Sequence, residues 1–188
     1  MPEGLYGGAF DPPHRGHVEL ARSAKEALGL QRLTVLVSAS PGHKTVTTPA
    51  GLRLRMARAA FPDDDVQLDH EARTIDTLRG HLEWHDPIFL IGADEFCDFL
   101  SWKEPDEVLE RARLAVATRP GFPRERLEAV LAKLQQPDRV LFFDIEPTPV
   151  ASRDLRSDFR PRDVPSAVAD IISAEGLYRA RPGYTSTA

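Results

Sequence analysis

Cysteine is almost missing from this chain of 188 residues, where Cys97 is the only one. No disulfide can therefore form within the chain, which is typical of proteins from a reducing compartment. We expect a cytoplasmic protein in which Cys97 packs as a small buried apolar side chain. No apolar run in the sequence approaches the roughly 20 residues that cross a bilayer. The amino terminus also lacks a cationic and apolar secretion signal, so no membrane association is expected.

Basic residues are not in excess either: 24 Lys and Arg stand against 29 Asp and Glu, and the formal net charge is -5. Proteins that hold nucleic acid by general electrostatic attraction carry the opposite balance, so no nucleic-acid partner is expected. A local basic pocket for phosphates stays open, because net charge does not describe a single cleft. The sequence leaves the oligomeric state undecided, with a homo-oligomer among the alternatives.

What the chain does contain is a regular alternation of short apolar runs and longer segments with helical periodicity. This alternation predicts an α/β fold with a Rossmann-like, doubly wound parallel sheet and helices on both faces. Strands are expected at 5–7, 32–38, 66–68, 87–92, 114–118 and 140–143. Helices are expected at 18–28, 52–60, 75–84, 94–100, 106–113 and 124–136.

A proline-rich link at 147–149 precedes a small helical C-terminal part, with helices near Ser152 and over 165–173. No internal repeat or low-complexity block divides the chain. We therefore expect a single domain over residues 1–180, followed by a flexible tail over residues 181–188.

The most informative stretch is GGAFDPPHRGH at residues 7–17, where the first strand runs into the first helix. Its two leading glycines allow backbone N–H groups to approach an anion closely. The helix tip adds unpaired N–H groups and the positive end of the helix dipole. His14 and His17 are three residues apart and therefore point to the same side. Together these features predict a phosphate site.

Ligands of open parallel sheets bind beyond the carboxyl ends of the strands, so the residues that follow each strand matter most. Lys44, Arg119 and Arg156 would bring positive charge to this edge. Asp94 is suited to accept ribose hydroxyls, and its alternative role is to cap the following helix. Trp102 either stacks on a flat heterocycle or covers the core.

Other candidates are weaker. Arg53, Arg55 and Arg58 share one helix, and we expect a solvated face with Arg53 turned toward the cleft. Trp84 is expected to pack. No serine or cysteine nucleophile stands beside a base, and Ser152 has no evident partner in the sequence. This favours direct displacement, which positioning and charge stabilisation can carry, over a covalent intermediate.

In the order of its motifs, the chain resembles the bacterial nicotinate-nucleotide adenylyltransferases, a family of the nucleotidylyltransferase superfamily that is marked by the (His/Thr)-x-Gly-His turn. The resemblance runs from about Gly4 to Tyr178. Beyond the histidine turn it rests on residues 42–44, 74–78, 92–94, 102–103, 119, 164–168 and 176–178.

The resemblance implies transfer of AMP from ATP to nicotinate mononucleotide, giving deamido-NAD and pyrophosphate. It implies Mg²⁺ carried with ATP and no metal ligated by the protein. By this resemblance the catalytic residues are His14, His17, Lys44 and Arg156. The implied ATP-binding residues are Gly7, Gly8, Ala9, Phe10, Gly92, Asp94 and Ser152. The implied mononucleotide-binding residues are Arg73, Thr74, Trp102, Lys103 and Arg119.

Three positions depart from the family pattern. Arg153 replaces a threonine of the phosphate loop, Arg73 replaces an aromatic residue of the pyridine pocket, and Gly42 replaces a proline. We hypothesise that Arg73 binds the substrate carboxylate as a bidentate partner, the alternative being a surface arginine.

Other functions remain open at this stage. The acceptor could be nicotinamide mononucleotide or phosphopantetheine, although Trp102 and the Thr74 segment argue against phosphopantetheine. A non-catalytic nucleotide-sensing module would fit the change at Arg153, whereas the intact His14 and His17 argue against it.

Overall fold

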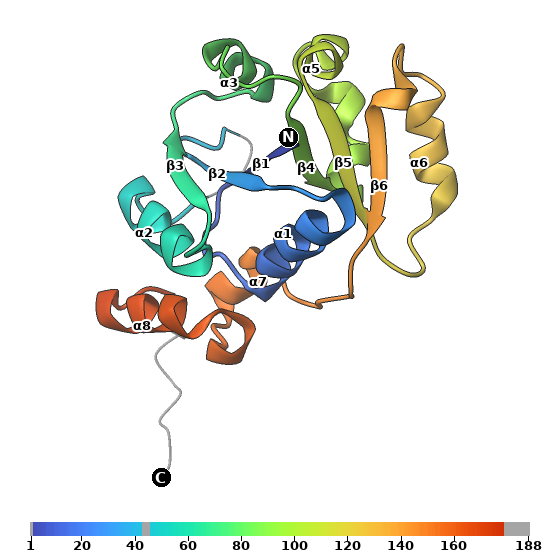
Figure 1. Ribbon diagram of the computed structural model, residues 1–188. Coiled ribbons are helices and arrows are strands. Elements are labelled where there is room, and N and C mark those ends of the chain that lie inside the picture. Colours follow the sequence, from blue (N-terminus) through green and yellow to red (C-terminus); the bar gives the residue numbers. More distant parts are fainter. Residues whose placement is uncertain (1, 43–45, 179–188) are drawn as a thin grey trace.

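The computed structural model describes residues 2–42 and 46–178, and within them the chain forms a six-stranded sheet (Figure 1). The strand order is β3-β2-β1-β4-β5-β6, and every neighbouring pair is parallel. The strands are β1 (Glu3–Gly8), β2 (Arg32–Ser38), β3 (Asp65–Asp69), β4 (Ile88–Gly92), β5 (Arg113–Thr118) and β6 (Val140–Asp144). This confirms the predicted doubly wound sheet, with its switch point between β1 and β4.

Helices cover both faces of this sheet (Figure 1). Those in the body of the fold are α1 (Arg15–Leu28), α2 (Ala50–Ala60), α3 (Thr74–Gly80), α4 (Ala93–Cys97), α5 (Pro105–Arg111) and α6 (Arg124–Leu131). The C-terminal helices are α7 (Ser152–Ser157) and α8 (Ser166–Glu175). Short 3-10 turns are η1 (Phe99–Ser101), η2 (Pro137–Arg139) and η3 (Pro161–Asp163). No helix in the described part of the chain has the length and apolar character needed to span a bilayer.

An apolar layer covers each face of the sheet, which explains why the strand sequences are continuous apolar runs. On one face, Tyr6 and Val35 pack with side chains of α1, α2 and α8. On the other face, Leu5 and Phe89 pack with side chains of α3, α4, α5 and α6. A parallel strand that is buried on both faces has no polar side to alternate with its apolar one.

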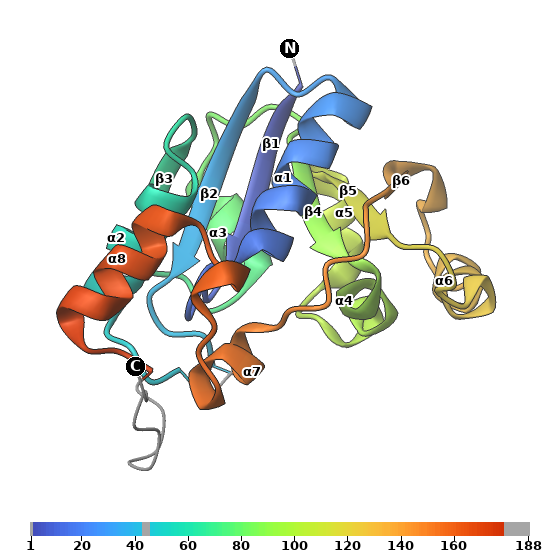
Figure 2. The same ribbon diagram turned by 90° about the horizontal axis from the view of Figure 1, so that it is seen from below.

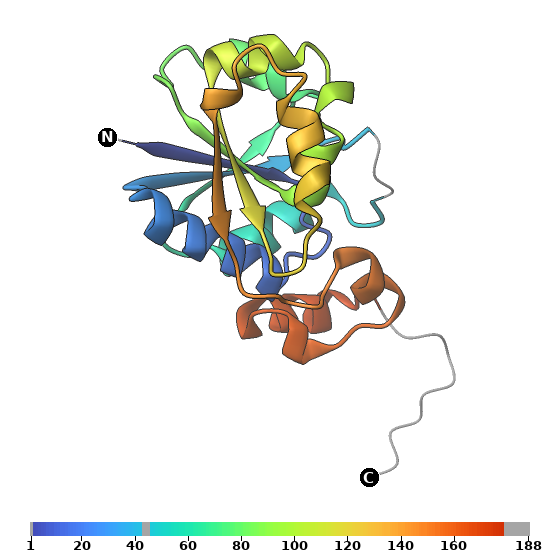
Figure 3. The same ribbon diagram turned by 90° about the vertical axis from the view of Figure 1, so that its right-hand side faces the viewer.

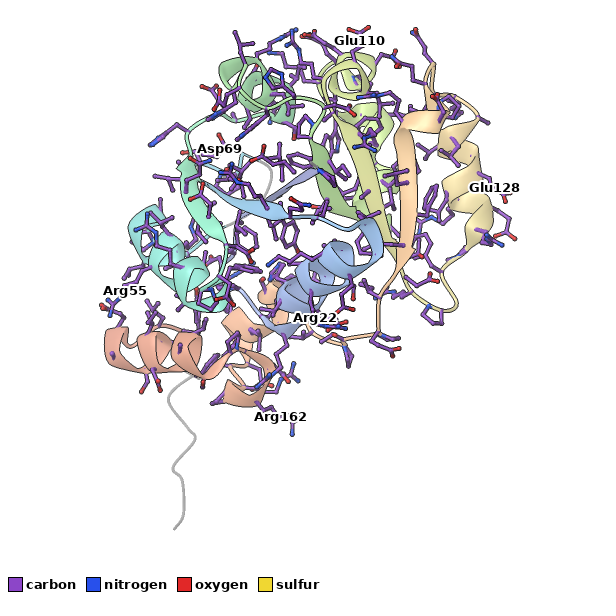
Figure 4. The ribbon with its side chains drawn as sticks, in the orientation of Figure 1. Arg22, Arg55, Asp69, Glu110, Glu128 and Arg162 are labelled. Carbon is purple, nitrogen blue, oxygen red and sulfur yellow. The ribbon has the colours of Figure 1, made fainter. Side chains whose placement is uncertain are left out.

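The C-terminal helices lie together beyond the α1 and α2 layer (Figures 2 and 3). Helix α8 packs on α2, where the exposed Arg55 reaches Glu175 with a nitrogen–oxygen distance of 2.6 Å (Figure 4). Helix α7 lies against the turn that precedes α1, where Ser152 and Arg156 bond the carbonyls of Pro12 and Asp11. The C-terminal part therefore packs on the face that carries the histidine turn.

Four predicted helices end earlier than expected, among them α5, which stops at Arg111 rather than at 113. Helix α3 stops at Gly80 rather than at 84, and His81, which follows it, stacks on Trp84 at a centroid distance of 4.0 Å. Helix α6 stops at Leu131 rather than at 136. The segment 94–100 divides into α4 and η1. Cys97 is half-buried against the core rather than fully buried, and the expected tail at 181–188 lies outside the described residues.

Candidate functional site

The end of β1 needs its glycines because aromatic rings lie against them. A Cβ on Gly7 would be 3.0 Å from the Phe89 ring, and a Cβ on Gly8 would be 2.9 Å from Phe10. Phe10 itself adopts a φ of 50° and is only 1% exposed. Its side chain is core, so any contact of Phe10 with a ligand must come from its backbone.

The two histidines of the motif are joined at the tip of α1. The His14 N–H donates to Nδ1 of His17 over 3.1 Å, and the two rings stack with centroids 3.7 Å apart. Because Nδ1 of His17 accepts this bond, a neutral His17 carries its proton on Nε2. Phe10 supports the His17 ring edge-on, at a centroid distance of 5.1 Å. In a neutral His17, Nε2 is therefore the protonated ring nitrogen.

His14 is 7% exposed, and its Nδ1 has no hydrogen-bond partner within the described residues. Burial lowers the pKa of His14 to about 4, against the opposing charge of Asp163. The ring is therefore neutral at pH 7. A buried nitrogen without a partner costs about 1–3 kcal/mol, which a ligand oxygen would offset.

Asp11 is a buried junction in the same turn. It accepts the Thr47 N–H over 2.8 Å and the Tyr178 hydroxyl, which also lies 2.8 Å from Thr48 Oγ1. Burial acts to raise the pKa of Asp11, but hydrogen bonds from Thr48, Tyr178 and Thr47 and the charge of Arg156 hold it below its ordinary value. Asp11 is therefore an anion that ties the turn to two distant segments.

Helix α7 brings two of the predicted residues to this turn. The Ser152 hydroxyl donates to the Pro12 carbonyl over 2.9 Å, and Nη1 of Arg156 donates to the Asp11 carbonyl over 2.8 Å. Between them in sequence, the Arg153 side chain is 88% exposed and lies 3.9 Å from Asp154. The residue that departs from the family pattern thus points into solvent.

The prediction for Arg53 was wrong. Arg53 is 1% exposed and lies neither on a solvated face nor among the residues that line the cavity described below. Its guanidinium donates to backbone carbonyls, because the carboxyl ends of β1 and β2 leave those acceptors unpaired beside it. Arg55 is exposed as expected, and Arg58 is exposed with a 3.4 Å contact to the Val66 carbonyl.

A cavity of about 580 Å³ opens at the carboxyl ends of β1, β2, β3 and β4. Its lining includes seven of the predicted residues: Gly7, Gly8, Ala9, Arg73, Thr74, Trp102 and Lys103. Trp102 forms part of the wall, with its ring edge-on to Phe99 at 5.3 Å and to Phe89 at 6.4 Å. Its indole is therefore held in place by two core rings.

The cavity contains two predicted cations with different surroundings. Nζ of Lys103 lies 2.8 and 3.1 Å from the two carboxylate oxygens of Asp76. Nη1 of Arg73 donates only a 3.3 Å bond to its neighbour Ala72, as far as the described residues show. A Cβ on Gly42 would be 3.8 Å from this Nη1. The charge of Lys103 is already neutralised, whereas no carboxylate of the described residues pairs with Arg73.

Sequence reasoning missed Asp69, which ends β3 and lines the cavity (Figure 4). Its carboxylate accepts the Thr77 hydroxyl over 2.9 Å and the Glu71 N–H over 3.0 Å. The rule that sites follow strand ends pointed to this position, but the strand at 66–68 was too weak a signal to be followed. Asp69 supports the Arg73–Thr74 segment by holding α3.

The remaining predicted residues lie outside the set that lines this cavity. They are His14, His17, Phe10, Gly92, Asp94, Ser152, Arg119 and Arg156. Asp94 and Arg119 follow the neighbouring strands β4 and β5, and both are exposed, 3.7 Å apart. Lys44 lies outside the described residues. Within residues 2–42 and 46–178, His, Cys, Asp and Glu side chains form no group of three that could hold a metal ion.

The amino-acid sequence is similar to those of known proteins. The chain matches the cytidylyltransferase-like family over residues 5–157. The probable nicotinate-nucleotide adenylyltransferase of Rubrobacter xylanophilus is 35% identical, over 96% of this chain and 93% of that protein. The protein of the same name from Thermus thermophilus is 36% identical, over 95% of this chain and 100% of that protein.

A solved structure shares the fold. Plasmodium falciparum nicotinic acid mononucleotide adenylyltransferase complexed with NaAD superposes with a TM-score of 0.71 at 19% identity, covering 95% of this chain and 97% of that chain. At this level of identity the likeness shows the fold alone.

Proposed function

Because this chain belongs to the nicotinate-nucleotide adenylyltransferase family, within the cytidylyltransferase-like proteins, we propose that it transfers AMP from Mg²⁺-bound ATP to nicotinate mononucleotide. The products are deamido-NAD and pyrophosphate. The observation that carries the proposal is the identity of 35–36% over nearly the whole of both chains. The histidine turn and a cavity of about 580 Å³ at the same strand ends support it.

The reaction needs little covalent chemistry from the protein. A 5′-phosphate oxygen of the mononucleotide forms a bond to the α-phosphorus of ATP, while the bond from that phosphorus to the α,β-bridging oxygen breaks. A phosphate monoester is largely dianionic at pH 7, so the attacking group requires no general base. The protein's task is to align the two substrates and to stabilise charge that develops on the leaving pyrophosphate.

The tip of α1 is suited to the phosphates of ATP. Helix geometry leaves the N–H groups of Arg15 and Gly16 without intrahelical partners, and the helix dipole adds positive potential. His17 would donate from Nε2, since its Nδ1 accepts the His14 N–H. Arg156, held against the same turn by the Asp11 carbonyl, would add a fixed positive charge together with Lys44.

The rest of the ATP would lie along the strand ends of the sheet. The Gly7–Ala9 turn lines the cavity and would let its backbone approach the nucleotide closely. Asp94, which follows β4, would accept the hydroxyls of the adenosine ribose beside Gly92. Ser152 would act close to the phosphates, because its hydroxyl is already bonded to the Pro12 carbonyl.

The cavity is suited to the pyridine mononucleotide. Trp102 presents a rigid indole on which the pyridine ring would stack. Arg73 and the backbone at Thr74 would bind the carboxylate, with Lys103 on another part of the same wall. Arg119, outside the cavity lining, would reach the mononucleotide from the end of β5. An arginine that pairs with no carboxylate of the described residues, beside a stacking surface, fits a pyridine ring that bears a carboxylate group.

The test is to incubate the purified protein with ATP, Mg²⁺ and one acceptor at a time, and to identify the dinucleotide by mass spectrometry. Nicotinate mononucleotide should yield deamido-NAD with one pyrophosphate for each dinucleotide. Nicotinamide mononucleotide and phosphopantetheine serve as matched acceptors. Binding of ATP with no pyrophosphate release from any acceptor would instead indicate a nucleotide-sensing module.

A further inference from the structure

Arg53 forms four hydrogen bonds from a fully buried position on α2. Nη1 donates to the carbonyls of Ala9 and Ser38 over 2.8 and 2.7 Å. Nη2 donates to the carbonyl of Ala39 over 3.0 Å, and Nε donates to that of Thr48 over 3.0 Å. All of its acceptors are backbone oxygens, and a planar guanidinium is the side chain that can serve several of them at once.

These acceptors occupy particular places in the chain. Ala9 follows β1 and lines the cavity, while Ser38 ends β2 and Ala39 follows it. Thr48 lies on the far side of the segment 40–47, whose residues Pro41 and Gly42 also line the cavity. Arg53 therefore bonds the backbone on both sides of this segment, at Ala39 and Thr48, and links it to the turn after β1 at Ala9.

A second junction holds the same segment from the other side. Asp11, in the histidine turn, accepts the Thr47 N–H over 2.8 Å. The Tyr178 hydroxyl bonds the Asp11 carboxylate and lies 2.8 Å from Thr48 Oγ1. Burial lowers the pKa of Arg53, and the negative charge of Asp11 opposes this effect. Both junctions are therefore buried, and the negative charge of Asp11 acts on the guanidinium of Arg53.

We propose that Arg53 is a positioning residue for adenylyl transfer, which aligns the turn after β1 with the Pro41–Gly42 wall of the cavity by clamping the backbone that connects them. It contacts neither substrate, because it is 1% exposed and lies behind the carbonyls. The inference rests on the proposed function, in which that turn holds ATP and the wall bounds the acceptor. In-line displacement depends on this alignment, and a misplacement of about 1 Å can cost on the order of a hundredfold in rate.

The test compares Arg53→Lys, Tyr178→Phe and the control Arg55→Lys. Arg53→Lys keeps the charge, but a single ammonium group cannot replace the Nε, Nη1 and Nη2 donors that bond the four carbonyls. Tyr178→Phe removes one hydroxyl from the second junction and keeps the ring. Arg55→Lys changes the same residue type two positions along α2, where the side chain is exposed and pairs with Glu175. The kcat per folded molecule, the KM of each substrate and the unfolding temperature are measured for each variant.

We expect kcat of Arg53→Lys to fall on the order of a hundredfold and that of Tyr178→Phe about tenfold, with Arg55→Lys unchanged. A residue that only stabilises the fold would lower the unfolding temperature and leave the kcat of folded molecules intact. A kcat for folded Arg53→Lys within about threefold of the wild type would overturn the proposal. If Arg53→Lys does not fold, Tyr178→Phe decides by the same criterion.

Failure of the proposed function can be distinguished from failure of the positioning role of Arg53. If the wild type makes no dinucleotide, the ATP dissociation constants of the same variants, measured by calorimetry without acceptor, still decide the inference. Positioning of the turn after β1 predicts about tenfold weaker ATP binding by Arg53→Lys. Equal ATP affinity of the inactive wild type and this variant, or no ATP binding by the wild type, would overturn the positioning role as well.

Discussion

The His17 side chain caps the start of the first helix at His14: the His14 backbone N–H donates to Nδ1 of His17 over 3.1 Å, and the two rings stack at 3.7 Å. One nitrogen of His17 therefore has a structural role, and the proposed phosphate contact is assigned to the other. The two roles can be separated, because amide side chains of different length place their polar atoms near different imidazole nitrogens.

His17→Asn and His17→Gln should separate capping from catalysis. The shorter Asn places its oxygen near the Nδ1 position and keeps the cap, whereas the longer Gln places its amide near Nε2. His17→Asn should lower kcat by about two to three orders of magnitude, as the loss of one oriented donor does, and His17→Gln should lower it less. Gln should retain more activity and Asn more stability. Steady-state kinetics and urea unfolding would show this order, and the reverse order would contradict the two assigned roles.

Acid should destabilise the fold through His14. Its pKa is about 4 in the folded chain and about 6.5 when unfolded, so the unfolded state binds more protons between these values. The free energy of unfolding should therefore fall as the pH drops from 6.5 toward 4, by up to roughly 3 kcal/mol. Urea unfolding at pH 7 and pH 4.5 measures this loss.

The control for this prediction is His14→Asn, which cannot titrate. The depressed pKa of Asp11 acts only below pH 4, so it does not obscure the window of His14. The variant should lose distinctly less stability over the same interval. An equal loss in both proteins would show that His14 does not cause the acid sensitivity.

The sheet could be predicted from sequence because its strands are buried on both faces. The run 32–38 matches β2 to the residue, since an apolar segment bounded by polar turns leaves little freedom. Helix ends were harder to predict. Helix α3 ends at Gly80, and glycine favours a helix end, but the apolar spacing that continues to Trp84 carried the prediction past it.

Some residues of the candidate site could be predicted from the sequence and others could not. Arg73, Thr74, Trp102 and Lys103 could be found by the rule of strand ends and by family resemblance, and the fold brings them to one cavity. The role of Arg53 could not be predicted in this way. Its partners are backbone carbonyls, which every residue type has, so the sequence of the partner residues does not reveal the contact. The bond from Tyr178 to Asp11 spans 167 positions in the chain, and no short motif encodes it.

Trp102 should report mononucleotide binding through its fluorescence. The chain has only one other tryptophan, Trp84, which stacks on His81 outside the cavity. In Trp84→Phe, nicotinate mononucleotide should still quench the remaining emission with unchanged affinity. Trp102→Ala should raise the KM for the acceptor about tenfold or more, as expected for a lost stacking surface, whereas Trp102→Phe should restore part of the affinity. Quenching that persists in Trp102→Phe would place the pyridine ring elsewhere.

Arg73 should set the preference for a carboxylate over an amide on the pyridine ring. In the described residues its guanidinium has no carboxylate partner, whereas Lys103 is paired with Asp76 at 2.8 Å. Removal of Arg73 should therefore cost a charge-assisted bond that nicotinate makes and nicotinamide does not. The ratio of kcat/KM values for the two mononucleotides should fall about tenfold or more in Arg73→Ala.

Two further variants make this outcome specific to Arg73. Arg73→Lys keeps the charge but loses the two-pronged geometry, so it should retain only part of the preference. Lys103→Ala removes a cation from the same cavity whose charge is already neutralised, and it should change the ratio by less than about threefold. If Lys103→Ala lowers the ratio as much as Arg73→Ala, general positive potential in the cavity, and not a bond from Arg73, selects the acceptor. If neither changes it, selection comes from the backbone at Thr74.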